Sequence, residues 1–249
     1  MMETVSRLLA TLLFVFLLPL VIFISLISLI SQGGPIIYRQ ARVGKNFKEF
    51  IIFKFRTMDK NSDNNAFASG ENIKASNWGK FLRKTKLDEI PQLINIIKGD
   101  MRFIGPRPEI PKFVNKDSFT YLNTLKPGLS GYSSILFRNE AELWPLIDAE
   151  NPYENILEVK IALDKYYAEK KSFYEDLKLA WITILSLFIP KMMGNYLLVR
   201  LLEIEDNGEF KLQEIISQLK LKDIQKQYHQ EDTSRNLRIL ILSDIISIL

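Results

Sequence analysis

The chain has no cysteine and only one histidine, His229, among its 249 residues. The absence of cysteine excludes disulfide bonds, zinc sites built on thiolates and a cysteine nucleophile. A single histidine excludes a histidine-rich metal site and argues against a Ser-His-Asp triad. Any chemistry must therefore depend on carboxylates, hydroxyls, lysines, arginines and backbone groups, with or without a hard metal ion.

The small net charge of +4 conceals an uneven distribution along the chain. Residues 31–130 contain 18 Lys and Arg against 9 Asp and Glu, whereas residues 131–249 carry a net charge of −5. A basic central region predicts an anionic partner, such as a phosphate compound, nucleic acid or an acidic membrane surface. The proportions of apolar (47%) and charged (25%) residues argue against a disordered chain.

A run of 23 uncharged residues, Leu8 to Ile30, predicts a membrane anchor. At about 1.5 Å per residue, a helix of this length can cross a ~30 Å hydrocarbon core. The run is too long for the usual core of a signal peptide and no good cleavage site follows it, which favours a retained anchor.

Pro19 lies in the middle of this run and removes one backbone hydrogen bond. Two interpretations remain open: a straight span with a mild kink, or a re-entrant helix that breaks at Pro19 and leaves by the face through which it entered. Basic residues on both flanks slightly favour the second; they are Arg7 before the run and Arg39, Arg42, Lys45 and Lys48 after it.

The rest of the chain predicts a mainly helical α+β fold with a small β-hairpin. Short β-rich runs at 36–38 and 50–53 flank Gly44, which predicts the hairpin. Residues 59–77 are polar and predict a surface loop. Helical spacing covers 79–98, but Pro91 requires a break around Leu87–Ile90, and Gly99 is expected to end the second piece.

Residues 154–189 are predicted to be helical, and their last part is apolar almost all round. A buried core helix is the default interpretation, and an interfacial helix is the alternative. The composition changes after residue 203, where an acidic stretch precedes an apolar end. This tail is either a packing element or the start of a further domain.

The densest cluster of charge is Asp88-Glu89, which follows Arg83, Lys84 and Lys86. The ordinary interpretation is a pair of acids at a helix N-terminus beside solvated lysines. The functional interpretation is a carboxylate kept ionised by cations, able to attack phosphorus or bind Mg²⁺.

Three further basic segments each have an ordinary interpretation as a strand edge or turn. In a strand, Lys54 and Arg56 share one face. Arg107 lies in the tight loop Gly105-Pro106-Arg107-Pro108, whose backbone and guanidinium suit phosphate oxygens. Arg138 follows the turn of residues 126–132. Together with the anchor, these segments suggest a phosphorylated, membrane-embedded substrate.

The chain resembles the bacterial sugar transferase family, the monotopic polyprenyl-phosphate phosphoglycosyl transferases. Five ordered strings over roughly residues 1–190 carry the resemblance: Tyr38-Arg39-Gln40 with Arg42 and Gly44, Phe53-Lys54-Phe55-Arg56-Thr57-Met58, Arg83 with Leu87-Asp88-Glu89-Ile90-Pro91-Gln92-Leu93 and Asn95, Gly99-Asp100-Met101, and Ile104-Gly105-Pro106-Arg107-Pro108. Residues 126–131 and Tyr166-Tyr167 extend it.

The resemblance implies transfer of a sugar-1-phosphate from a UDP-sugar to undecaprenyl phosphate, with release of UMP and with Mg²⁺ as cofactor. It implies the first membrane step of surface polysaccharide, capsule, O-antigen or glycoconjugate synthesis, on the cytoplasmic face of the bacterial inner membrane. It favours re-entry at Pro19 and interfacial helices around a compact catalytic domain. The expected partners are the two substrates and membrane lipid, without nucleic acid; a homodimer is an option.

By this resemblance Asp88 is the nucleophile that forms an aspartyl phospho-sugar, and Glu89 assists as base or metal-site partner. Asp88 is also the expected metal ligand. Substrate phosphates and nucleotide are expected at Lys54, Arg56, Arg83, Arg107 and Arg138. The expected domains are an anchor (1–34), a catalytic domain (35–202) and an extension of unknown role (203–249).

Several positions depart from the family pattern, including Leu18 before the helix-breaking proline, Arg102, Tyr132-Ser133-Ser134 and Phe137. Some lie where sugar or nucleotide recognition is expected, so the identity of the sugar stays open. Two functions of other classes compete: a membrane-tethered nucleic-acid-binding module, motivated by the basic surplus, and a scaffold protein without catalysis.

Overall fold

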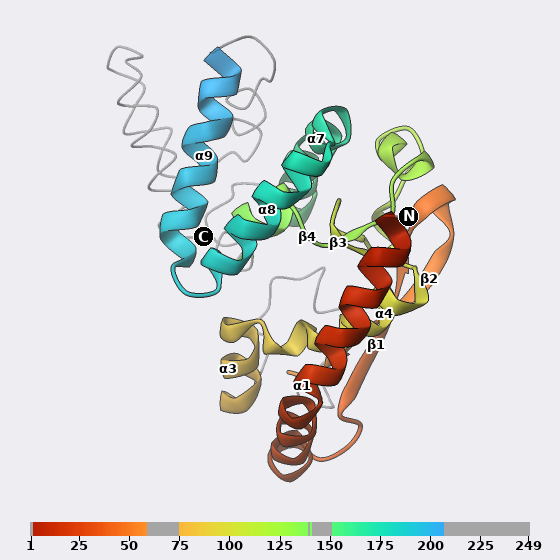
Figure 1. The fold of residues 1–249 in the computed structure, drawn as a ribbon, viewed down its shortest axis with the longest axis vertical. Coiled ribbons are helices and arrows are strands. Elements are labelled where there is room, and N and C mark those ends of the chain that lie inside the picture. The colour runs from red at the N-terminus through yellow and green to blue at the C-terminus, as the bar shows by residue number, and fades with distance from the viewer. Residues whose placement is uncertain (1, 59–74, 139, 141–150, 207–249) are drawn as a thin grey trace. The chain divides into compact units, whose positions relative to one another are not determined.

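The computed structural model of the chain describes residues 2–58, 75–138, 140 and 151–206 (Figure 1). The chain forms two compact units, Met1–Leu129 and Ser130–Leu249. Most of the predicted loop at 59–77 and most of the predicted extension lie outside the described residues. The two units divide the chain between Leu129 and Ser130. The expected domain boundaries at 34 and 202 stay predictions.

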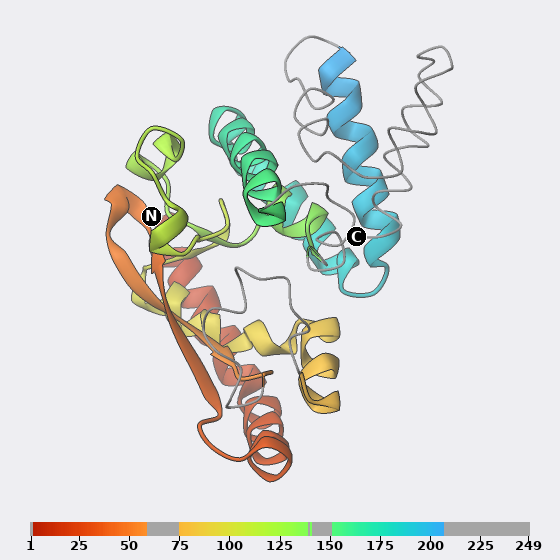
Figure 2. The ribbon, with the colours of Figure 1, turned by 180° about the vertical axis from the view of Figure 1, so that it is seen from behind.

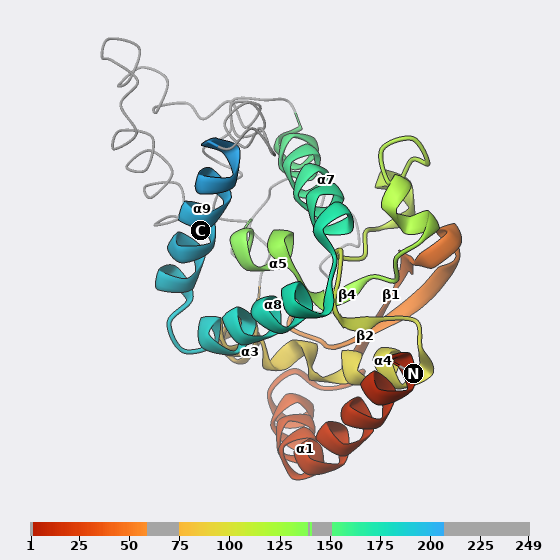
Figure 3. The ribbon, with the colours of Figure 1, turned by 45° about the horizontal axis from the view of Figure 1, so that its top comes forward.

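The first unit begins with α1 (Met2–Gln32), which contains Pro19. Within the described residues, one helix, Glu3–Gln32, is long and apolar enough to cross a bilayer. The helix runs through Pro19 as one element, but its ribbon changes direction along its length (Figures 1 and 3). A proline inside a helix is the usual physical cause of such a bend.

The inner face of α1 packs on two apolar clusters. Ala10 belongs to a cluster with Ile52 and Ile96, and Ile24 belongs to a second cluster with Leu82. The outer face leaves large apolar side chains exposed along its whole length. The helix therefore has one face buried against the protein and one exposed apolar face.

The predicted hairpin is confirmed. Strands β1 (Ile37–Val43) and β2 (Glu49–Phe55) pair antiparallel with Gln40 opposite Ile52, and they run alongside α1 (Figure 2). The connection includes the 3₁₀ turn η1 (Lys45–Phe47), in which Asn46 has a φ of 57°. The strands are longer than the two β-rich runs predicted them to be.

The predicted break between two helical pieces is also confirmed. The helix α3 (Asn77–Thr85) is followed by the 3₁₀ helix η2 (Leu87–Gln92), which contains Pro91, and then by α4 (Leu93–Lys98). Gly99 caps α4 in the left-handed conformation with a φ of 88°, as expected.

The remainder of the first unit is formed by short elements. Strand β3 (Arg102–Ile104) pairs with β4 (Gly128–Ser130), and two 3₁₀ turns, η3 (Pro111–Phe113) and η4 (Thr120–Asn123), lie between them in the sequence. Gly128 therefore begins a strand, where the sequence predicted only a loop.

The second unit is helical in its described part, with α5 (Tyr132–Leu136), α7 (Pro152–Lys170), α8 (Phe173–Ser186) and α9 (Pro190–Asp206). The single helix predicted for 154–189 is wrong, because it divides between α7 and α8. Ser172 caps α8, and its hydroxyl accepts a hydrogen bond from the backbone N–H of Glu175 at 3.1 Å. This cap starts a new helix where apolar spacing alone suggested continuity.

Candidate active site

Three segments of the first unit meet at the carboxylate of Glu89. Its Oε1 accepts a hydrogen bond from Nζ of Lys54 at 2.9 Å and from Nη2 of Arg107 at 3.3 Å. Lys54 comes from β2, Glu89 from η2, and Arg107 from the loop after β3. Since Glu89 is 35 positions from Lys54 and 18 positions from Arg107 in sequence, the fold itself builds the cluster.

Asp88 lies next to this cluster and is buried, with 7% of its surface exposed. Its Oδ1 is buried and accepts no hydrogen bond within the described part of the chain. Buried polar atoms normally have partners, so such an oxygen is available for a ligand or a reaction. Burial raises the pKa of Asp88, and the nearby Lys54 charge opposes the rise.

Glu89 experiences the opposite balance. Burial alone would raise its pKa, but the positive charges of Lys54, Arg107 and Lys86 outweigh this and hold the pKa well below its usual range. Glu89 is therefore the permanently ionised partner of the cations, whereas Asp88 keeps an oxygen free.

The local chain conformation explains how two adjacent acids differ. Lys86 ends α3 in the left-handed conformation, with a φ of 59° and a ψ of 15°, and η2 starts directly after it. Asp88 and Glu89 lie in the first turn of η2, while Leu87 and Ile90 pack against an apolar cluster on α1 and β2. The acids were predicted at the start of a helix, and that helix is a 3₁₀ turn.

Lys86 belongs to the site although the sequence argument did not select it. Burial is the main cause that lowers its pKa to about 8, and the positive charges of Arg107 and Lys54 lower it further, while Glu89 opposes them. The sequence feature that indicates this role of Lys86 is its position in a cationic run, two residues before Asp88.

Arg83 lies at the edge of the site. Its Nε donates a hydrogen bond to Oγ1 of Thr57 at 2.8 Å. Burial lowers its pKa, and the negative charge of Asp88 opposes that shift. The structure thus places Arg83 in the electrostatic field of the acid, as a phosphate-binding role would require.

The other two predicted arginines have different surroundings. Arg56 donates hydrogen bonds to the backbone carbonyls of Gln32, Gly33 and Gly34 at 2.7 to 3.1 Å. Its guanidinium therefore fastens the turn after α1, and it is not among the groups around Glu89. Arg138 follows α5 and belongs to the second unit.

The loop that carries Arg107 is fastened to β1. Nη1 of Arg42 donates to the carbonyl of Pro108 at 3.1 Å and to Oε1 of Glu109 at 3.2 Å. The backbone N–H of Val43 donates to the carbonyl of Glu109 at 2.9 Å. These bonds fix the backbone next to Arg107, so they also position its guanidinium against the acid.

The residues present suit a magnesium ion that shares its ligands with a substrate. The described residues contain no group of three or more acidic or histidine side chains that could hold a metal without other ligands. Mg²⁺ commonly binds one or two carboxylates together with substrate phosphates. The partnerless Oδ1 of Asp88 is a ligand of that kind.

The sequence is similar to characterised transferases. A family model described as bacterial sugar transferase matches residues 1–190. UDP-N-acetylgalactosamine-undecaprenyl-phosphate N-acetylgalactosaminephosphotransferase of Aeromonas hydrophila is 33% identical over 173 residues, which cover 67% of this chain and 38% of the relative. UDP-glucose:undecaprenyl-phosphate glucose-1-phosphate transferase of Escherichia coli strain K12 is 29% identical, over 74% of this chain and 39% of the relative.

A relative of more similar length is the uncharacterized sugar transferase EpsL of Bacillus subtilis strain 168. It is 30% identical over 176 residues, which cover 69% of this chain and 79% of the relative. The matched part of the chain thus spans less than two fifths of the Aeromonas and Escherichia relatives but most of EpsL. Because the family match covers residues 1–190 of 249, the chain belongs to the bacterial sugar transferase family.

Proposed function

We propose that the chain transfers a sugar-1-phosphate from a UDP-sugar to undecaprenyl phosphate through a covalent intermediate on Asp88. The observation that carries the proposal is the division of roles in the acid pair. Glu89 holds Lys54 and Arg107 at 2.9 and 3.3 Å, while the adjacent Asp88 keeps a buried oxygen without a partner. A cationic site with one available carboxylate suits displacement at phosphorus.

In the first step, a carboxylate oxygen of Asp88 attacks the phosphorus that bears the sugar. An Asp–O–P bond forms, the bond to the bridging oxygen of the diphosphate breaks, and UMP leaves with that oxygen and its electron pair. Burial raises the pKa of Asp88, so its ionised form is more basic, and hence more nucleophilic, than an exposed aspartate.

In the second step, a phosphate oxygen of undecaprenyl phosphate attacks the same phosphorus. The new P–O bond gives a lipid diphosphate sugar, and the bond to Asp88 breaks and restores the free carboxylate. No external proton donor is needed, because both leaving groups are stable anions. A reaction that needs no proton donor suits a chain with a single histidine.

The cations supply charge stabilisation in both steps. Lys54, Lys86 and Arg107 surround Glu89 in the free protein, and phosphate oxygens can share their donors when substrate binds. Glu89 then acts as the counter-ion that keeps these groups charged and in place. Bound Mg²⁺, held by Asp88 and substrate phosphates, would add positive charge next to the phosphate oxygens.

The attachment of α1 supports a re-entrant anchor. Near its start, Glu3 forms an ion pair with Lys126 at 2.9 Å. At its end, Arg56 holds the carbonyls of Gln32 and Gly33, both at 2.7 Å. Both ends thus contact one compact unit, whose charged surface belongs in water, and this supports a helix that enters and leaves the bilayer on one side. We place this side at the cytoplasmic face of the inner membrane.

The second unit has an apolar helical face of its own. Helix α8 leaves the large apolar side chains of Leu177, Trp181 and Ile184 exposed at helical spacing, and Phe188, just after the helix, is exposed as well. Lysines flank this face, with Lys178 within α8 and Lys191 in α9. An apolar face bordered by lysines is typical of a helix that lies in the headgroup region.

The test of this function is Asp88→Asn in membranes that contain the full chain. We expect UMP release from the UDP-sugar to fall by on the order of 10⁴-fold or more, the scale at which enzymes respond to loss of a nucleophile. A radiolabelled sugar-phosphate adduct, trapped by acid quench and mapped by mass spectrometry, should appear on Asp88 in the unaltered protein.

Asp117→Asn is the matched control, because Asp117 is exposed in a loop of the same unit. It should keep both turnover and adduct. Near-normal turnover in Asp88→Asn, or an adduct on another residue, would eliminate the proposed nucleophile.

A further inference from the structure

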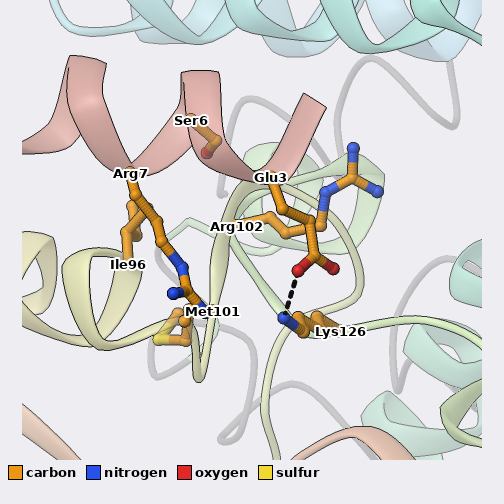
Figure 4. A pocket seen from close by; sticks show the side chains of 8 residues that line it. Glu3, Ser6, Arg7, Ile96, Met101, Arg102 and Lys126 are labelled. Atoms are coloured by element: carbon orange, nitrogen blue, oxygen red, sulfur yellow. Dashed lines mark hydrogen bonds and ion pairs between the residues drawn. The ribbon is translucent and has the colours of Figure 1, made fainter. Parts of the chain in front are cut away.

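A shallow hollow lies where the first two turns of α1 meet the segments that follow α4 (Figure 4). The space inside it that a water-sized group can occupy is about 10 Å³, and the unfilled volume reaches about 190 Å³ when the open solvent above it is included. Helix α1 contributes Glu3, Ser6 and Arg7 to its walls, and the segments after α4 contribute Arg102 and Lys126. None of these residues belongs to the cluster around the two acids of η2.

The hollow has more positive charge than negative charge. Nζ of Lys126 is 2.9 Å from Oε2 of Glu3, which is the single carboxylate among the lining residues. Arg7 makes no side-chain hydrogen bond or ion pair within the part of the chain that the structure describes. Three cations against one carboxylate leave a net charge of +2 at this place, which favours an anion.

The guanidinium of the exposed Arg7 lies close to the backbone of Gly99. It lies directly over Gly99, where an added Cβ would be 1.9 Å from Nη2. Gly99 also needs its φ of 88° to end α4, so a glycine serves both purposes here. In Figure 4 the side chains of Arg7 and Lys126 extend toward the same region beside Met101.

The position of the hollow along α1 matches the headgroup level of a bilayer. Large apolar side chains that point away from the protein start at Val5 and continue with Leu8, Leu9 and Leu12, each more than half exposed. Arg7 and Glu3 are the last charged residues before the uncharged run. Basic residues at the end of a lipid-facing helix lie where phosphate headgroups are found.

We propose that this hollow binds the phosphate group of an anionic membrane phospholipid. The phosphate accepts hydrogen bonds from Arg7 and Lys126, and the acyl chains lie along the exposed apolar face of α1. A lipid suits the site better than free phosphate does, because the cations and the apolar face adjoin each other. Glu3 competes with the phosphate for Lys126. The proposal concerns different residues from the proposed catalytic function and does not depend on it.

The experiment titrates the detergent-solubilised full chain with short-chain phosphatidylglycerol and, in a second arm, with inorganic phosphate. Affinity is measured by thermophoresis. We expect Arg7→Ala/Lys126→Ala to weaken the affinity for phosphatidylglycerol about 10-fold or more, because two charge-assisted hydrogen bonds are lost. Lys112→Ala/Lys116→Ala removes the same charge from exposed positions of the same unit and should change the affinity less than about 2-fold.

A variant that is expected to strengthen binding distinguishes an effect on the binding site from a loss of folded protein. Glu3→Gln removes the competing carboxylate and should tighten phosphatidylglycerol binding about 2- to 5-fold, whereas Glu49→Gln, an equal change at an exposed position of β2, should not. Equal loss of affinity in both double variants, or no gain in Glu3→Gln, overturns the proposal. Inorganic phosphate that binds as tightly as phosphatidylglycerol would show a site for free phosphate and overturn the lipid assignment.

Discussion

The acid pair shows how two adjacent carboxylates acquire different tasks. Glu89 accepts hydrogen bonds from Lys54 and Arg107, so the cations lower its pKa despite its burial. Asp88 is buried beside the same cations, yet its Oδ1 has no hydrogen-bond partner among the described residues and its pKa is raised. A nucleophile must have an available lone pair, and the buried Oδ1 of Asp88 has one, whereas Glu89 is held through Oε1 by two cations.

Lys86 gives a prediction on pH. Because burial lowers its pKa to about 8 from 10.5, Lys86 loses its charge near pH 8, and phosphate binding should weaken as the pH rises through that value. We expect kcat/KM for the UDP-sugar to fall above about pH 8. Lys86→Arg should move this fall to higher pH, because a guanidinium stays charged. A pH–rate profile between pH 6 and 10 measures both.

The pH dependence of the free energy of unfolding provides a control for this prediction. A lysine whose pKa is lowered on folding opposes folding while it is protonated, and this cost disappears as the pH rises from about 8 to 10.5. The Lys86 contribution to stability therefore rises over the range in which its contribution to activity falls. An unchanged pH midpoint of kcat/KM in Lys86→Arg would contradict the assignment.

The sequence identified part of this site for physical reasons that are local. The cationic run before Asp88 and Glu89 is visible along the chain, and so are the arginines in their turns. The partner of each cation is not visible, because it depends on tertiary packing. Arg56 donates hydrogen bonds to carbonyls at and just after the end of α1, 22 to 24 residues earlier in the sequence. The alternation of residues along β2 predicts only that Arg56 shares a strand face with Lys54, and it does not predict these bonds. Lys86 resembled a solvated lysine until burial was known.

At the scale of elements, Asn95 joins α4 to the hairpin. Its Nδ2 donates to the carbonyl of Ile51 at 2.6 Å, and its Oδ1 accepts from the backbone N–H of Phe53 at 3.2 Å. The side chain thus pairs with backbone groups on the free edge of β2, as a neighbouring strand would. Since η2 directly precedes α4 in the sequence, the link also fixes the acids relative to Lys54.

Asn95→Ala should therefore destabilise the first unit. The change leaves the partly buried carbonyl of Ile51 and N–H of Phe53 without this partner, which costs about 1–2 kcal/mol in total. We expect the thermal midpoint of the detergent-solubilised protein to fall by several degrees. Asn77→Ala, at an exposed position in α3, should leave it nearly unchanged, and an equal fall in both variants would show that Asn95 has no special role.

The elements that were predictable have strong local signals. Gly44 marks the hairpin turn and Pro91 marks the break before α4. The division of α7 from α8 was missed because Ser172 is a weak signal inside a long periodic stretch, and it acts only when its hydroxyl meets the N–H of Glu175. The pairing of β3 with β4 was missed because each strand has three residues, too few for alternation to show.

At the scale of the whole molecule, the basic charge and the exposed apolar helix belong to the same unit. The basic first unit holds the site, and α1 belongs to the same unit through the Glu3–Lys126 ion pair and the contacts of Arg56. In the proposed function, a soluble phosphate donor and a lipid phosphate acceptor meet in this positively charged place at the bilayer surface.

This arrangement predicts that both ends of α1 face the cytoplasm. The chain has no natural cysteine, so Thr4→Cys and Lys48→Cys each provide one thiol, before and after the apolar run. Both positions are exposed, and a membrane-impermeant maleimide should label neither in intact bacterial cells and both after permeabilisation. A straight span puts the two ends on opposite sides, because a helix of 23 uncharged residues fits the ~30 Å hydrocarbon core. Labelling of Thr4→Cys in intact cells, with Lys48→Cys protected, would therefore contradict re-entry at Pro19.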